Sequence, residues 1–66
     1  MYTVSYRAPG DADESTRNTL DTEPTEGVSL DDVIKICRIT DAEADLFDAA
    51  GFRKGWTHPD GTYTLT

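Results

Sequence analysis

The sequence predicts a single α+β domain, residues 1–66, in which two short helices pack on one face of a small antiparallel sheet of three or four strands. Three observations support this fold class: an alternating apolar segment at the start, helical periodicity in the middle, and a turn flanked by Thr-rich and aromatic runs at the end. Only 36% of the 66 residues are hydrophobic, which suffices for one core and no more. The predicted order is β-(β)-α-α-β-β, with the second strand optional.

The first strand is predicted over residues 1–7, because Tyr2, Val4 and Tyr6 alternate with polar side chains. Pro9 and Gly10 follow it and end the alternation. The next stretch, residues 11–27, is rich in acids and threonine. Within it, residues 16–22 either pair with the first strand as a hairpin or form a mobile loop, and the pattern leaves both possibilities open.

The first helix is predicted over residues 30–38. Ser29 is a favourable N-cap, and Asp31 and Asp32 fall in the first turn, where the helix dipole favours carboxylates. The apolar residues that recur at helical spacing are Leu30, Val33, Ile34 and Cys37. We therefore expect one face of this helix, including Cys37, to be buried.

A second helix is predicted over residues 41–50. Thr40 and Glu43 have the spacing of a capping box, and Gly51 followed by Phe52 is typical of a helix C-terminus. The apolar stripe of this helix would be Ala42, Leu46, Ala49 and Ala50, with Phe47 at its margin.

The last segment predicts a hairpin. His58, Pro59, Asp60 and Gly61 form its turn, since Pro supplies the turn dihedral and Gly tolerates positive φ. We expect a register that sets Trp56 opposite Tyr63, which would place both rings on the core face.

Composition excludes several classes of function. Thirteen acids against six cations give a net charge of −7, which disfavours direct binding to nucleic acid or to an anionic membrane. The one cysteine cannot form an internal disulfide or complete a zinc site, which is typical of a reducing compartment. No apolar run is long enough for a leader or a membrane span, so we expect a cytoplasmic protein of a bacterial or phage-infected cell.

Catalytic and cofactor chemistry is not indicated. The chain has one His and one Cys, and no residue pattern of nucleophile, base and orienting group. Asp11, Asp13 and Ser15 imitate the start of a calcium loop, but Thr16 and Thr22 replace the Gly and the Glu that such a loop requires. We predict no enzyme activity, no catalytic residues, no cofactor and no metal.

The acids follow a pattern of their own. On the predicted second helix, Asp41, Asp45 and Asp48 lie at i, i+4 and i+7, so they would form one ridge without cations. Acids of the first helix and of the loop before it extend this ridge only if the two helices cross at a suitable angle, which the sequence does not determine. The predicted binding residues are Asp31, Asp32, Asp41, Glu43, Asp45, Asp48, Glu23 and Glu26.

Such a ridge favours nucleic-acid mimicry, in which carboxylates occupy the phosphate-binding groove of a DNA-binding protein. In size and charge the chain resembles the small phage-encoded DNA mimics, including anti-CRISPR proteins. The resemblance implies a monomeric stoichiometric inhibitor without a cofactor. Its partner would be a basic DNA-binding protein, such as a subunit of a CRISPR surveillance complex.

Two alternatives belong to other classes. The first is a halophile-adapted structural or accessory domain, whose acids hold water and salt. The second is a small regulatory domain that contacts a partner protein, which predicts an exposed apolar patch near Phe47, Ile36 or Ile39.

Overall fold

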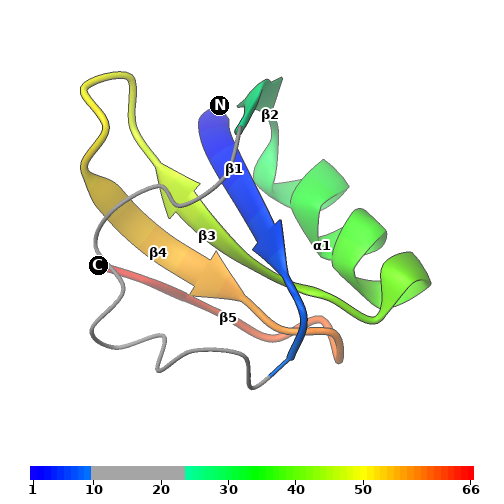
Figure 1. The fold of residues 1–66 in the computed structure, drawn as a ribbon. Coiled ribbons are helices and arrows are strands. Elements are labelled where there is room, and N and C mark those ends of the chain that lie inside the picture. The colour runs from blue at the N-terminus through cyan, green and yellow to red at the C-terminus, as the bar shows by residue number, and fades with distance from the viewer. Residues whose placement is uncertain (10–23) are drawn as a thin grey trace.

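The computed structural model describes residues 1–9 and 24–66, and within these ranges it contains five strands and one helix (Figure 1). They are β1 (Tyr2–Arg7), β2 (Thr25–Val28), α1 (Leu30–Thr40), β3 (Glu43–Phe47), β4 (Arg53–Thr57) and β5 (Tyr63–Leu65). The strands form one sheet in the order β2-β1-β3-β4-β5, and every neighbouring pair is antiparallel. The β1–β3 pair therefore lies at the centre of the sheet.

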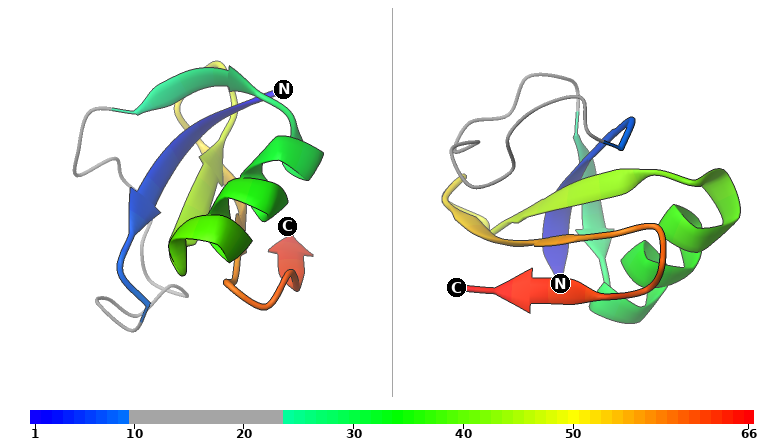
Figure 2. Two further views of the ribbon diagram at one scale, coloured as in Figure 1. Left: turned by 90° about the vertical axis from the view of Figure 1, so that its right-hand side faces the viewer. Right: turned by 90° about the horizontal axis from the view of Figure 1, so that it is seen from below.

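The helix α1 covers one face of the sheet and contacts β1, β3 and β4 (Figure 2). The core lies between them, and Tyr2, Tyr6 and Leu30 pack against its edge. Its buried members are Val4, Val28, Val33, Cys37, Ala44 and Leu46. The predicted first strand, with its alternating core face, and the predicted burial of Cys37 are both confirmed.

Helix α1 begins and ends as its local sequence dictates. The Oγ of Ser29 accepts a hydrogen bond from the backbone N–H of Asp32 at 3.2 Å, which confirms the predicted N-cap. At the other end Asp41 adopts the left-handed conformation with φ 53°, and the N–H of Ala42 bonds to the Cys37 carbonyl at 3.0 Å. The helix has 11 residues, and none in the described part of the chain is long and apolar enough to span a membrane.

The predicted second helix is wrong, and so is a fold of two helices on three or four strands. Residues 43–47 form β3, the central strand, and all five of its residues are buried. Its acids, Glu43 and Asp45, lie on the side away from α1 and are buried against cations, but in the sequence they resemble the exposed polar face of a helix. Tertiary pairing with β1 and β4 decides the structure here. The Gly51–Phe52 pair belongs to the β3–β4 turn, where Gly51 has φ 87°.

The strand that pairs with β1 is β2, with Tyr2 opposite Val28 and Val4 opposite Thr25. A second strand is thus present, but it follows the stretch at residues 16–22 where we considered one. That stretch lies outside the described residues.

The predicted C-terminal hairpin is present as β4 and β5, but its register differs by one residue from the expected one. Trp56 lies opposite Thr64, and Thr57 lies opposite Tyr63. Thr57 takes the core position because its hydroxyl reaches the buried Sγ of Cys37 at 3.2 Å. Trp56 consequently points to the face of the sheet away from α1.

Gly55 is required by the close approach of β4 and β5. A methyl group at this position would overlap the backbone carbonyl oxygen of Thr64 and crowd Leu65. We predict that Gly55→Ala lowers the free energy of unfolding by about 2–3 kcal/mol, because backbone atoms must move. The control is Gly51→Ala, where the methyl enters open space and only the left-handed backbone costs about 1 kcal/mol. Urea unfolding measures both, and equal losses would contradict the close approach.

Candidate functional site

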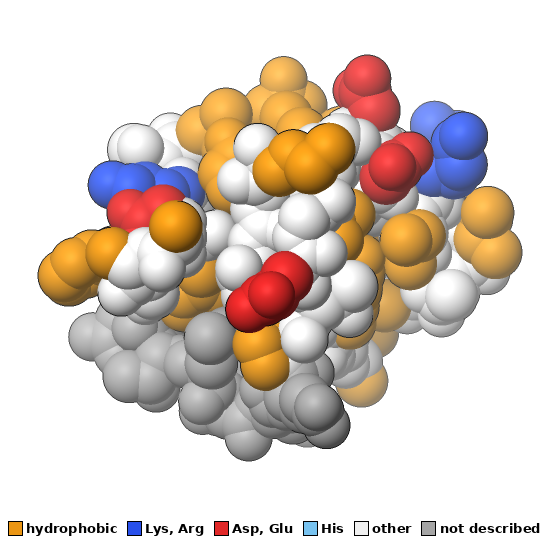
Figure 3. Space-filling model, turned by 90° about the horizontal axis from the view of Figure 1, so that it is seen from above, with side chains coloured by type: hydrophobic (Ala, Val, Ile, Leu, Met, Phe, Trp, Pro, Cys, Tyr) orange, Lys and Arg blue, Asp and Glu red, His pale blue; other side chains and the backbone are white. Residues whose placement is uncertain are grey.

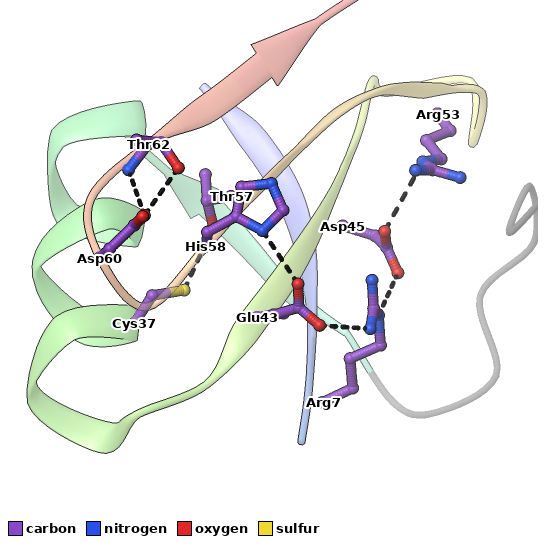
Figure 4. A network of polar contacts seen from close by, with 9 residues as sticks. All are labelled: Arg7, Cys37, Glu43, Asp45, Arg53, Thr57, His58, Asp60 and Thr62. Atoms are coloured by element: carbon purple, nitrogen blue, oxygen red, sulfur yellow. Dashed lines mark hydrogen bonds and ion pairs between the residues drawn. The ribbon is translucent and has the colours of Figure 1, made fainter. Parts of the chain in front are cut away.

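A group of charged side chains is buried on the face of the sheet that α1 does not cover (Figure 4). Arg7 lies at its centre. Its Nη1 donates to Oε1 of Glu43 at 2.9 Å, and its Nε donates to Oδ2 of Asp45 at 3.4 Å. The side chain of Arg7 is only 3% exposed and that of Asp45 is fully buried. One arginine of β1 thus connects to two carboxylates of β3.

The group continues in both directions from these carboxylates. The second oxygen of Asp45, Oδ1, lies 3.6 Å from Nε of Arg53. The guanidinium of Arg53 in turn lies 4.2 Å from the ring centroid of Trp56, in cation–π geometry. The second oxygen of Glu43, Oε2, lies 3.0 Å from Nδ1 of His58. We call Arg7, Glu43, Asp45, Arg53 and His58 the buried charge network.

Strand register brings these residues together. Arg7 pairs directly with Glu43 across β1 and β3, while Asp45 pairs with Trp56 across β3 and β4. The β3–β4 register then shifts, so that Phe47 faces Arg53. Without this bulge Arg53 would lie opposite residue 48 and point to the helix side, because side chains alternate along a strand. The bulge therefore directs Arg53 toward Asp45.

The two carboxylates and two guanidiniums of the network cancel in charge. Burying them removes their hydration, and each pair regains only part of this free energy through its contacts. All five residues are engaged with partners. Such a set favours one strand register over its alternatives, and its geometry is that of a structural cluster.

The structure separates the acids of the predicted ridge. Glu43 and Asp45 are brought together but are buried, with residue exposures of 8% and 0%. Asp41 caps the C-terminus of α1, and Asp48 lies in the β3–β4 turn. A ridge with Asp41, Asp45 and Asp48 at i, i+4 and i+7 is therefore wrong, because it required a helix where the chain forms a cap, a strand and a turn.

Asp48 and Asp60 have local roles in turns. Oδ1 of Asp48 accepts hydrogen bonds from the backbone N–H groups of Phe52 and Ala50, and these lower the pKa of its carboxyl group. Its Oδ2 also lies 3.7 Å from Nζ of Lys54. Asp60 accepts from the hydroxyl and the backbone N–H of Thr62, which likewise lowers its pKa.

Three of the predicted binding residues are exposed at the start of α1. Glu26 lies on β2, and Asp31 and Asp32 lie in the first turn of the helix. We call these three residues the entry acids. The acidic side chains visible in Figure 3 form separate groups with uncharged or basic surface between them. Glu23, the remaining predicted residue, lies outside the described residues.

The cations of the network were not predicted as partners of the acids. The available signal was the alternation of Glu43, Asp45 and Phe47 with Ala44 and Leu46, which has the period of a strand. Had residues 43–47 been assigned to a strand, two acids on one face would have required cations on its neighbours. His58, which the sequence placed in the turn of the last hairpin without a partner, is half-buried against Glu43.

Two further polar groups belong to the other face of the sheet. Burial raises the pKa of the Cys37 thiol, which suits an unreactive core residue. Burial also raises the pKa of Tyr6, whose hydroxyl has no hydrogen-bond partner among the described residues. Tyr6 borders an apolar hollow of about 500 Å³ together with Ile36 and Thr40. Within residues 1–9 and 24–66, no cluster of three His, Cys, Asp or Glu could hold a metal ion.

Comparison with known proteins adds no relative. No protein-family model matches the chain, and no curated protein and no solved structure matches it.

The buried charge network provides a test of its structural role. We predict that Asp45→Asn lowers the free energy of unfolding by about 3 kcal/mol, because it leaves two buried guanidiniums without their shared carboxylate. Asp41→Asn is the matched control: Asn accepts the left-handed conformation of this exposed cap, so the change should be within about 0.5 kcal/mol. Urea or thermal unfolding measures both. If Asp45→Asn lowers the free energy of unfolding as little as Asp41→Asn does, the network does not stabilise the fold.

Proposed function

We propose that this domain is a non-catalytic binding protein that engages a basic partner through its exposed carboxylates. One observation carries the proposal. Within residues 1–9 and 24–66 the buried network contains two acids and two arginines, so six acids and three cations of these residues remain outside it, with a net charge of −3, in a chain whose total charge is −7. The acidic excess of the described residues therefore lies outside the network and can attract cationic surfaces.

Within the described residues we assign the contact to the entry acids, Glu26, Asp31 and Asp32. They are exposed, and no ion pair of theirs occurs among the described residues, whereas Asp48 is engaged by Lys54 and by its own turn. The ridge of the DNA-mimic hypothesis is not part of this proposal. If the partner is a nucleic-acid-binding protein, such as a subunit of a CRISPR surveillance complex, the domain and duplex DNA compete for one cationic groove.

The experiment compares two variants of equal charge. Glu26→Gln with Asp31→Asn and Asp32→Asn removes the entry acids, while Asp41→Asn with Asp48→Asn and Asp60→Asn removes three acids elsewhere. With a fluorescent octa-arginine peptide as the probe, we expect the first variant to bind about tenfold more weakly, or about 1.4 kcal/mol for the three charges. The second variant should change affinity by less than about twofold. Anisotropy titrations at low salt measure both.

Two controls complete this experiment. Affinity should fall steeply as KCl rises, because the attraction is screened. Unfolding curves check that both variants fold. Equal weakening by the two variants would contradict a site at the entry acids and show that only total charge matters. Competition by duplex DNA for a partner captured from lysate then tests whether that partner is a DNA-binding protein.

The dispersed acids of Figure 3 favour a second candidate, a halophile-adapted domain whose carboxylates hold water and salt. This function predicts a different response to salt. The free energy of unfolding should rise by several kcal/mol between about 0.1 M and about 3 M KCl, as screening removes repulsion among the exposed carboxylates. The octa-arginine peptide should bind both triple variants equally. Stability that is unchanged in molar KCl would eliminate this candidate.

A further inference from the structure

The strand β5 forms one edge of the sheet, opposite the edge formed by β2. Among residues 1–9 and 24–66, no strand pairs with its outer side. Its two large side chains are also accessible, with Tyr63 49% and Leu65 48% exposed. An edge strand with open backbone groups and apolar side chains is a template for pairing with another chain.

The hydrogen bonds to β4 show which backbone groups point outward. The carbonyl of Thr62 accepts from the N–H of His58 at 2.9 Å, and the N–H of Thr66 donates to the carbonyl of Lys54 at 2.8 Å. Backbone groups alternate in direction along an antiparallel strand, so Thr64, midway between them, also faces β4. The N–H and C=O of Tyr63 and of Leu65 therefore face away from the sheet, and each residue offers one donor and one acceptor.

The two edges of the sheet differ in how they resist pairing. The β2 edge has a register shift against β1, a charged residue in Glu26 and a left-handed Gly27 with φ 70°. Bulges and charged side chains are the usual protection of an edge strand. The β5 edge consists of Tyr63, Thr64 and Leu65, without charge, proline or bulge. This asymmetry makes β5 the edge that is open to a partner.

We propose that β5 pairs with β5 of a second copy of this chain, in antiparallel orientation about a two-fold axis at Thr64. The outward groups determine this register. Tyr63 then lies opposite Leu65 of the second copy, and the two equivalent pairs exchange four backbone hydrogen bonds. Thr57, which pairs with Tyr63, contacts Cys37 of α1, so Tyr63 and Leu65 lie on the helix side of the sheet. Each tyrosine ring would cover a leucine across the interface.

Charge favours a second copy over a basic segment at this edge. The cations Arg38 and Lys54 flank β5: the Arg38 side chain lies beside Gly61, and Lys54 lies next to Thr66. Lys54 is partly neutralised by Asp48 at 3.7 Å, so Arg38 is the cation that disfavours a basic peptide at this edge. The two-fold arrangement sets the Lys54 end of one copy alongside the turn of the other, which carries Asp60. Opposite charges thus approach at both ends of the interface, while β5 itself is neutral.

The dimer and the proposed binding of a basic partner use opposite edges of the sheet and respond oppositely to salt. Two copies of charge −7 repel each other at long range, so screening should strengthen their association. Binding of a basic partner should weaken under the same conditions. Failure of one proposal therefore does not imply failure of the other.

Sedimentation equilibrium on the purified chain tests the dimer. At about 0.5 mM protein and about 1 M KCl we expect a mass of twice 7.3 kDa, with dissociation on dilution or at low salt. Leu65→Lys should raise the dissociation constant at least about tenfold, because an edge lysine opposes pairing. The matched control is Ile39→Lys, which replaces another exposed apolar residue, 76% exposed, on α1. It should dimerise like the parent chain.

Amide hydrogen exchange gives a readout that does not depend on a folded variant. In the parent chain, exchange at Tyr63 and Leu65 should slow as protein concentration rises, whereas that of Thr64, bonded to β4, should change little. If the chain remains a monomer at every protein and KCl concentration, the proposal is wrong. It is also wrong if the chain remains a monomer and β5 instead binds a foreign strand-forming peptide. Loss of the dimer in both lysine variants also overturns it, because the contact would then be a general apolar one.

Discussion

The pairing of Arg7 with Glu43 and Asp45 is the interaction on which the rest of the structure depends. It joins β1 to β3, the two strands at the centre of the sheet, through contacts of 2.9 and 3.4 Å. A shift of one residue in this pair would turn either Arg7 or the two carboxylates toward α1 and its apolar core, and so would separate the charges from their partners. The ion pairs therefore mainly disfavour other registers of β1 against β3. Their net contribution to the free energy of unfolding is small, because burying the charges removes their hydration.

The same network determines what the surface can do. Among the described residues it buries two acids and two arginines, so the net negative charge of these residues lies outside it. The two edges of the sheet are unlike. The β2 edge, which leads directly into α1, carries exposed carboxylates. The β5 edge is neutral, and no strand among residues 1–9 and 24–66 pairs with its outward backbone groups. Electrostatic attraction suits the first edge and strand pairing suits the second, so a small domain can offer two kinds of contact.

Much of the local structure was predictable from residue patterns. The alternation of Tyr2, Val4 and Tyr6 identified β1, Ser29 identified the start of α1, and the Pro-Asp-Gly turn identified the last hairpin. Each depends on interactions within a few residues of the chain. The candidate site was less predictable: the acids in the first turn of α1 were correctly placed on a helix, while Asp45 was placed on a surface ridge that does not exist and Glu43 was expected to be a binding residue.

By itself the sequence determined the charge balance, the strand at the start, the capped first helix and the closing hairpin, because these follow from composition and short-range spacing. Tertiary structure alone decided that residues 43–47 form the central strand and that their carboxylates are buried. The segment has only five residues, too few for its alternation to outweigh the helix signals around it, and the partners of its carboxylates, Arg7 and Arg53, come from other strands. The β4–β5 register was decided in the same way, by the contact of Thr57 with Cys37 on the helix.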